Sequence, residues 1–218
     1  MKDVIVADDH PMIVAGLMDI VQGSGRYRVV ATFSNGTDAL EFISSGYEGI
    51  AILDINMGDV SGLEISRHVH QNAISLQIII LTLFDDPEFL LEAIDYGVQG
   101  YLSKENTAEE LLNCIDQVGE GKRYISQSFF ESHKDISSDI ESIFQVRERI
   151  AALSQRELNV ISLISQGMSS TQIADTLFLS PKTIENHRGN ICKKLNITGH
   201  NSLTKWVAEH KRMIEYTS

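Results

Sequence analysis

The chain has 218 residues, of which 43% are hydrophobic and 22% are charged, a composition that favours packed domains over disorder and a length that suits two domains. No apolar run approaches the roughly 20 residues of a membrane-spanning helix, and the N-terminus lacks the pattern of a secretion signal, so we expect a cytoplasmic protein. The two cysteines, Cys114 and Cys192, lie far apart and outside any C-x-x-C motif, which disfavours a disulfide framework or a zinc site.

The net charge of −12 is unevenly distributed along the chain. Residues 1–130 have a net charge of −13, whereas residues 151–218 have a net charge of +3. An acidic domain joined to a mildly basic one indicates that any contact with nucleic acid is confined to the C-terminal part.

Short apolar runs alternate with helical patterns up to residue 121, which predicts a parallel α/β sheet with five strands and five helices. The predicted strands are Val4–Ala7, Arg28–Phe33, Ile50–Leu53, Ile78–Leu81 and Val98–Leu102. The predicted helices start near Pro11, Asn35, Leu63, Pro87 and Thr107. Asp86 is the predicted cap of the fourth helix, and Thr107 and Glu110 have the spacing of a capping box for the fifth.

Polar residues follow four of these strands. They are Asp8 and Asp9 after the first, Asp54 after the third, Thr82 after the fourth and Lys104 after the fifth. Because ligands of open parallel sheets lie beyond the carboxyl ends of the strands, we expect these side chains to converge on one patch. Such a set suits a divalent cation and a phosphoryl group. Taken singly, each has a simpler interpretation: a solvated turn or helix cap, a strand-end hydroxyl, or a surface lysine.

Residues 122–150 are the predicted linker between two domains. The stretch from residue 126 to residue 138 is polar, and it is followed by apolar residues at helical spacing, namely Ile140, Ile143, Phe144, Ile150 and Ala151. We therefore expect a flexible piece followed by an amphipathic helix.

Residues 151–218 show the patterns of four helices and no strand. The start and stop signals are a capping box at Ser154 and Glu157, Gly167, a cap at Ser169 or Ser170, Ser180 with Pro181, and a last helix over Asn201–Met213. A short helix, a tight turn and a longer helix with basic residues predict a helix-turn-helix, while a helical hairpin that contacts another protein is the alternative.

In this order, the two halves resemble a two-component response regulator of the NarL/FixJ group, in which a receiver domain precedes a LuxR-type helix-turn-helix. The receiver resemblance rests on Asp8, Asp9, Asp54, Thr82, Tyr101 and Lys104. The DNA-binding resemblance rests on Leu153–Glu157, Gly167–Ser169, Ile173–Ala174, Leu179–Ser180, Lys182–His187, Asn190–Ile191 and Lys194–Leu195. Together the two resemblances imply a flavodoxin-like, doubly wound five-stranded receiver over residues 1–121, a partly helical linker over 122–150 and a four-helix domain over 151–218.

The resemblance also assigns roles at the strand ends. It implies that Asp54 accepts a phosphoryl group, that Thr82 and Lys104 contact the phosphate, and that Tyr101 is a switch residue. It implies Mg²⁺ as the cofactor, bound by Asp9, Asp54 and the backbone carbonyl of Asn56 directly and by Asp8 through water. Gly58 stands where the family usually has proline, which loosens the turn without removing a ligand.

In the helix-turn-helix, Lys182 and Thr183 lie in the first turn of the second helix, where backbone N–H groups and the helix dipole favour a DNA phosphate. The resemblance places Glu185, Asn186 and Gly189 at base edges. Further candidates for contacts to the DNA backbone are Arg188, Lys193 and Lys194. Glu185 and Gly189 occupy positions where some relatives carry lysine, so the DNA sequence preference does not transfer from any relative.

These assignments predict a regulator whose DNA binding and transcriptional effect are controlled by phosphorylation of Asp54, and not an enzyme. The expected partners are a sensor histidine kinase, double-stranded DNA and a second copy of the chain. One alternative is a regulator of the same fold that acts without phosphorylation. Another is a phosphatase with an aspartate nucleophile of haloacid-dehalogenase type, which is disfavoured because that chemistry generally needs a second aspartate where Asn56 stands.

Overall fold

The computed structural model describes residues 1–133, 137–199, 201–211 and 214. The chain divides into two compact units, Met1–Asp135 and Ile136–Ser218, and the division falls inside the predicted linker. No helix in the described part of the chain is both long and apolar enough to cross a membrane.

The first unit is built on a parallel sheet in the order β2-β1-β3-β4-β5-β6. Its strands are β1 (Lys2–Ala7), β2 (Tyr27–Phe33), β3 (Ile50–Leu53), β4 (Gln77–Thr82), β5 (Gly100–Ser103) and β6 (Tyr124–Ile125). The first five confirm the doubly wound α/β prediction, and their order is that of flavodoxin-like folds.

The predicted number of five strands was wrong by one, because β6 joins the edge of the sheet beside β5. The Tyr124 amide donates to the Gln99 carbonyl at 2.8 Å, and the Ser126 amide donates to the Tyr101 carbonyl at 3.0 Å. A strand of two residues has no alternating pattern that a sequence could reveal. The beginning of the predicted linker therefore belongs to the sheet.

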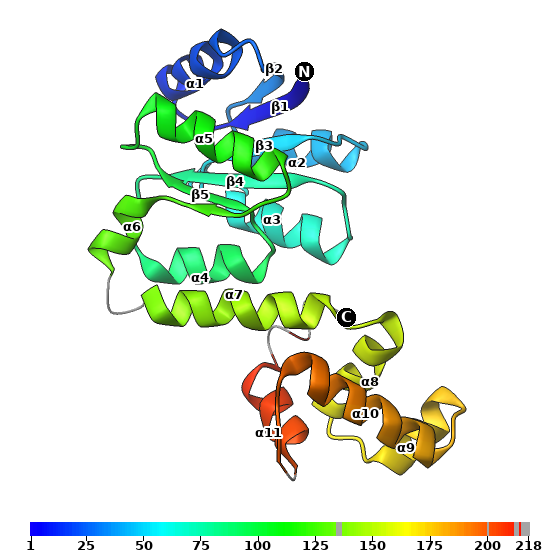
Figure 1. Ribbon diagram of the computed structural model, residues 1–218. Coiled ribbons are helices and arrows are strands. Elements are labelled where there is room, and N and C mark those ends of the chain that lie inside the picture. Colours follow the sequence, from blue (N-terminus) through cyan, green and yellow to red (C-terminus); the bar gives the residue numbers. More distant parts are fainter. Residues whose placement is uncertain (134–136, 200, 212–213, 215–218) are drawn as a thin grey trace. The chain divides into compact units, whose positions relative to one another are not determined.

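Helices cover both faces of this sheet (Figure 1). They are α1 (Pro11–Gly23), α2 (Gly36–Ser44), α3 (Gly62–Gln71), α4 (Pro87–Asp95) and α5 (Ala108–Gly119), with the short α6 (Gln127–Ser132) after β6. Helices α1 and α5 pack on one face against alternate residues of the central strands, including Val4, Ile52 and Leu102. Helices α2, α3 and α4 lie on the other face (Figure 1). The stretches of β1, β3 and β4 that are buried on both sides, Val4–Ala7, Ile50–Leu53 and Ile78–Leu81, are consequently apolar.

The predicted capping box of α5 is only half formed. The Thr107 side chain accepts a hydrogen bond from the Glu110 amide at 3.2 Å. The Glu110 carboxylate does not return to the cap; it accepts from Asn106 at 2.8 Å and from the Tyr124 hydroxyl at 3.3 Å. Glu110 thus fastens β6 to α5, a tertiary contact that takes precedence over the local one.

The predicted flexible part of the linker is also corrected, since α6 lies within it. Its Phe129 side chain is buried and meets the Tyr101 ring edge-on, with ring centroids 5.7 Å apart. The predicted amphipathic helix is confirmed as α7 (Ser137–Ala151), while residues 134–136 lie outside the described part.

The four helices predicted in the C-terminal part are confirmed as α8 (Gln155–Ser165), α9 (Ser170–Leu177), α10 (Pro181–Leu195) and α11 (Ser202–Glu209). Ser169, not Ser170, caps α9, because its side chain accepts from the Gln172 amide at 3.3 Å. Ser180 caps α10 by accepting from the Thr183 amide at 3.1 Å. The predicted end of the last helix at Met213 lies outside the described residues.

The capping box of α8 carries an additional ion pair. The Glu157 carboxylate accepts from the Ser154 amide and from Lys194 Nζ, each at 2.7 Å. Burial alone would raise the pKa of Glu157, but the bonds to Lys194 and Ser154 outweigh it and lower the pKa to about 2. Glu157 therefore joins the start of α8 to the end of α10.

We predict that Glu157→Gln lowers the free energy of unfolding of this unit by about 2 kcal/mol at pH 7, because Gln retains the cap and loses the ion pair. A carboxyl group whose pKa is lowered by folding stabilises the folded state at pH values above its ordinary pKa of 4.5. The difference in unfolding free energy between the native chain and the variant should therefore disappear as the pH falls from 4.5 towards 2. Urea unfolding followed by the fluorescence of Trp206, the single tryptophan, reports on this unit.

Glu185→Gln is the matched control, since Glu185 is exposed on α10. A Glu157→Gln deficit that stays constant between pH 7 and pH 3 would contradict the assignment.

Candidate functional site

The polar residues predicted at the strand ends converge at the carboxyl edge of the sheet. Backbone hydrogen bonds fix two of them: the Asp54 amide donates to the Ala7 carbonyl at 2.9 Å, and the Lys104 amide donates to the Thr82 carbonyl at 2.8 Å. The end of β3 is thereby held to that of β1, and the end of β5 to that of β4, while the parallel pairing of β3 with β4 joins the two pairs.

Lys104 joins the carboxylates at the centre of this site. Its Nζ lies 2.7 Å from Asp8 Oδ2 and 2.9 Å from Asp54 Oδ2, and the three side chains are only 5%, 2% and 5% exposed. Burial raises the pKa of Asp54, and the bond and charge of Lys104 act in the opposite direction without cancelling this rise. Burial lowers the pKa of Lys104, but its bonds to Asp8 and Asp54 outweigh it, so the pKa is raised and the ammonium stays charged.

Ligand atoms suited to a cation gather beside this pair. One atom each from Asp8, Asp9, His10 and Asp54 lies within 4.8 Å of the others. Asp9 is partly exposed at 37% and Asn56 is exposed in the loop after β3, so solvent reaches this side of the site. Carboxylate oxygens open to water fit Mg²⁺, which takes few protein ligands and keeps several waters.

Sequence reasoning missed His10, whose Nδ1 lies 2.6 Å from Asp9 Oδ1 and 3.3 Å from Asp8 Oδ1. Its position directly after the aspartate pair was the available signal. It also missed Gly62 at the start of α3, where an added Cβ would collide with the Asp54 carbonyl oxygen. A glycine at this position lets the first residue of α3 lie close to the Asp54 carbonyl oxygen.

Thr82 and Tyr101 lie on neighbouring strands and on the same face of the sheet, towards α4. The Thr82 hydroxyl is buried and accepts from the Phe84 amide at 3.0 Å, which leaves its proton available for another acceptor. Tyr101 is 3% exposed, and its hydroxyl has no hydrogen-bond partner among the described residues. Both predicted residues thus border the loop after β4.

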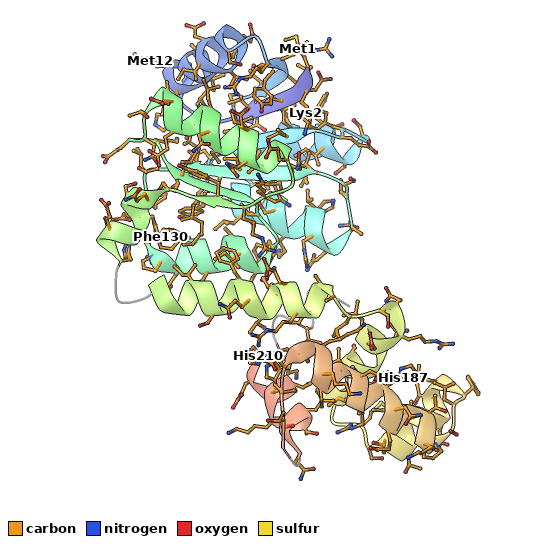
Figure 2. All side chains as sticks on the ribbon, viewed as in Figure 1. Met1, Lys2, Met12, Phe130, His187 and His210 are labelled. Atoms are coloured by element: carbon orange, nitrogen blue, oxygen red, sulfur yellow. The ribbon has the colours of Figure 1, made fainter. Side chains whose placement is uncertain are left out.

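In the C-terminal unit, most of the predicted DNA-contacting residues share one side of α10. Lys182, Glu185, Asn186, Gly189 and Lys193 are all exposed and recur at intervals of three or four residues. The opposite side contains the fully buried Ile184, Ile191 and Leu195. His187, labelled in Figure 2, lies between the two sides and is partly buried.

The remaining candidates on α10 have partners within the unit. Lys194 Nζ is bonded to Glu157 and, at 3.1 Å, to the Ala152 carbonyl. Arg188 donates to the Thr204 hydroxyl at 3.2 Å, and the Thr183 hydroxyl lies 2.8 Å from that of Ser180. Lys194 thus holds α10 to α8, and its charge is already neutralised by Glu157.

Comparison with known proteins matches both units to established families. Residues 4–116 match the response regulator receiver domain, and residues 151–207 match the bacterial regulatory proteins of the luxR family. The response regulator UvrY of Escherichia coli K12 is 30% identical over 210 residues, which cover 96% of this chain and 95% of UvrY. The oxygen regulatory protein NreC of Staphylococcus epidermidis is 29% identical over 218 residues, covering 98% and 99% of the two chains.

Among solved structures, the RcsB–DNA complex is similar in fold. Its protein chain is 24% identical, with a TM-score of 0.54 over 95% of this chain and 98% of that one.

We predict that Lys104→Gln lowers the free energy of unfolding of the receiver unit by about 3 kcal/mol, because two buried carboxylates lose their shared counter-ion. Added Mg²⁺ should recover part of this loss by taking over the neutralisation. Urea unfolding followed by circular dichroism, with and without Mg²⁺, measures both effects.

Lys122→Gln is the matched control, because Lys122 and its partner Glu120 are 60% and 61% exposed, and exposed pairs contribute at most about 1 kcal/mol. Equal losses of unfolding free energy in the two variants would show that the buried Lys104 interactions stabilise the unit no more than an exposed ion pair does.

Proposed function

The chain belongs to the response regulators of two-component systems, with a receiver domain followed by a LuxR-type DNA-binding domain that regulates transcription, and from this premise we propose that phosphorylation of Asp54 controls its binding to DNA. The observation that carries the proposal is the buried Lys104 ammonium between Asp8 and Asp54. It neutralises charge at the carboxylate that is to become the acceptor.

The proposed reaction transfers a phosphoryl group from a histidine of a sensor kinase to Asp54. An Asp54 carboxylate oxygen attacks phosphorus, the bond from phosphorus to the donor nitrogen breaks, and an acyl phosphate forms. Because phosphoryl transfer depends mainly on positioning and electrostatics, the fixed charges around the acceptor supply most of the catalysis.

The surrounding residues have matching proposed roles. Asp9, Asp54 and the Asn56 carbonyl would hold Mg²⁺, with Asp8 acting through water, and the ion when bound neutralises charge on the transferring group. Lys104 would turn from the Asp54 carboxylate to a phosphate oxygen. The Thr82 hydroxyl, which already accepts from Phe84, would donate its proton to another oxygen.

The signal would then pass through the loop after β4. Movement of the Thr82 hydroxyl towards the phosphate shifts the loop that holds Phe84, and the neighbouring Tyr101 repacks. We propose that the outcome is a homodimer that binds two half-sites on double-stranded DNA in the cytoplasm, because one helix-turn-helix buries little DNA surface. The chain thereby acts as a regulator and not as an enzyme.

The exposed side of α10 is the proposed reading surface. Lys182 and Thr183 would hold phosphates at the start of the helix, where the helix dipole adds to the attraction. Glu185 and Asn186 would contact base edges, and Arg188 and Lys193 would contact the DNA backbone. Lys194 is assigned to the contact between α10 and α8 and not to DNA, because Glu157 neutralises the charge of Lys194.

Gly189 lies in the same exposed stripe, and nothing in the structure requires a glycine there. An added Cβ would meet no atom within 4 Å, and glycine inside a helix is less stable than alanine by about 1 kcal/mol. A close approach of the DNA at this point would explain the glycine.

The test of the proposal is the Asp54→Asn variant. With Mg²⁺ and acetyl phosphate, the native chain should gain the mass of one phosphoryl group. It should also bind a DNA site obtained by in vitro selection with this chain at least about tenfold more tightly. Asp54→Asn should show neither change, because the amide is not a nucleophile. Intact mass spectrometry and gel-shift titration measure the two effects.

Asp19→Asn, on the exposed side of α1, is the control and should behave like the native chain. Labelling of Asp54→Asn at the native level would move the acceptor elsewhere, and labelling without a change in affinity would favour a regulator that does not depend on phosphorylation.

We further predict that Gly189→Ala stabilises the C-terminal unit by about 0.5–1 kcal/mol and yet weakens DNA binding about tenfold. The added methyl group favours the helix but fills the space proposed for the DNA. Urea unfolding and gel-shift titration of the same preparation separate the two effects.

Gly16→Ala is a matched control, because Gly16 is an exposed helical glycine in α1 with nothing within 4 Å of an added Cβ. It should stabilise its own unit without changing DNA affinity. Unchanged DNA affinity in Gly189→Ala would show that the DNA does not approach this residue.

A further inference from the structure

Helix α6 covers Tyr101 and is the last element of the receiver unit. It follows β6 at the edge of the sheet (Figure 1) and lies beyond residues 4–116, the part that matches the receiver family. The next element along the chain is α7, which begins at Ser137 in the second unit. A change in α6 is therefore the most direct route along the chain from the receiver unit to the C-terminal unit.

Contacts with Tyr101 and with the loop after β4 hold α6 in place. The Phe129 ring is 5% exposed and meets the Tyr101 ring edge-on, with centroids 5.7 Å apart. The Ser126 amide donates to the Tyr101 carbonyl at 3.0 Å. At the other end of the helix, His133 Nδ1 lies 3.5 Å from Asp85 Oδ1 in the loop. The helix thus rests on the tyrosine and on the loop.

By itself, α6 is too short to persist. It has six residues, and in the described part of the chain its N-terminus has no hydrogen bond to a capping side chain. Isolated helices shorter than about 12 residues are marginal in water. A cavity of about 180 Å³ between α6 and the loop, lined by Phe84 and Ser132 among others, shows that their packing is incomplete. Loss of the Phe129 contact would therefore release the helix.

The Tyr101 side chain breaks no hydrogen bond when it moves. Its hydroxyl is buried and has no partner among the described residues. A buried hydroxyl without a partner destabilises the position that it occupies. Thr82 lies on the neighbouring strand and on the same face of the sheet. A shift of Thr82 towards a phosphate would therefore leave space into which the Tyr101 ring can move, away from Phe129.

The loop after β4 responds to the same shift. The Phe84 amide donates to the Thr82 hydroxyl at 3.0 Å, so the start of the loop follows that hydroxyl. Asp85 is the next residue, and it is the one that contacts His133. Movement of Thr82 therefore disturbs both supports of α6 together, because one support is Tyr101 and the other is this loop.

We propose that residues 126–133 form a strap that holds the receiver unit in its resting state and is released when Asp54 is phosphorylated. The inference rests on the proposed phosphorylation and adds the route by which the signal leaves the unit. The six residues of α6 span about 9 Å as a helix and up to about 20 Å when extended. Release of the strap lengthens the tether between the two units and lets the C-terminal unit reach its DNA half-site.

Hydrogen–deuterium exchange of the full chain measures the release. The chain is labelled with acetyl phosphate and Mg²⁺, and intact mass spectrometry gives the labelled fraction. Amides of residues 126–133 should exchange at least about tenfold faster in the labelled chain, because they lose their helical hydrogen bonds. Amides of α1 are the internal control and should not change. Unchanged exchange of the strap in a fully labelled chain would overturn the proposal.

Phe129→Ala should release the strap without a phosphoryl group. Residues 126–133 should then exchange at the fast rate in the unlabelled chain, and affinity for the selected DNA should rise at least about fivefold. Phe129→Leu, which keeps a large apolar side chain, should retain slow exchange. Circular dichroism verifies that each variant is folded.

Phe130→Ala is the matched control, because Phe130 of the same helix, labelled in Figure 2, is only partly buried. The same substitution has the same effect on intrinsic helix propensity. Equal effects of the two substitutions would overturn the proposal, because they would not depend on the contact with Tyr101. Fast exchange in Phe129→Ala without a gain in DNA affinity would also overturn it.

One further variant separates this proposal from the phosphorylation of Asp54. The chain with both Asp54→Asn and Phe129→Ala has no acceptor, and it should still bind DNA as Phe129→Ala does. That result would support the strap even where labelling of Asp54 fails. A labelled native chain with a slowly exchanging strap would refute the strap and leave the phosphorylation proposal intact.

Discussion

The receiver unit depends on one buried interaction, the Lys104 ammonium held between the Asp8 and Asp54 carboxylates. Burying three charges is costly, and their mutual attraction offsets the cost only when the geometry is good. That geometry requires the ends of β1, β3 and β5 to be placed together, which the parallel register of the sheet provides. The charge pattern and the fold therefore support each other, and the site remains open to a cation on the side of Asp9.

The second feature is the extension of the receiver unit by β6 and α6. These elements cover Tyr101 through Phe129. The Tyr124 amide ties β6 to the sheet, and the Tyr124 hydroxyl ties it to Glu110 of α5. Tyr101 is consequently packed between the loop after β4 and a segment that follows the family match. Any change at Thr82 that reaches Tyr101 also reaches α6, because close-packed interiors transmit displacements.

In the C-terminal unit, the two sides of α10 have separate roles. Ile184, Ile191 and Leu195 pack in the core, and Lys194 fixes the end of the helix to Glu157 at the start of α8. The core contacts on its buried side and the ion pair at its C-terminal end thus fix the helix, so its exposed residues lie on a rigid element. Rigid support of this kind reduces the entropy lost on binding.

The sequence alone determined the five main strands, the helix caps at Asp86, Ser154 and Ser180, and the convergence of Asp8, Asp54 and Lys104, because these depend on local periodicity, local hydrogen bonds and the parallel-sheet rule. The tertiary structure decided the rest. Strand β6, the Glu110 bond to Tyr124, the burial of Tyr101 under Phe129, and the ion pair that removes Lys194 from the exposed stripe all join residues distant in sequence or lacking a periodic pattern. Such contacts are selected by the packing of the whole unit and leave no signature in any short stretch of the chain.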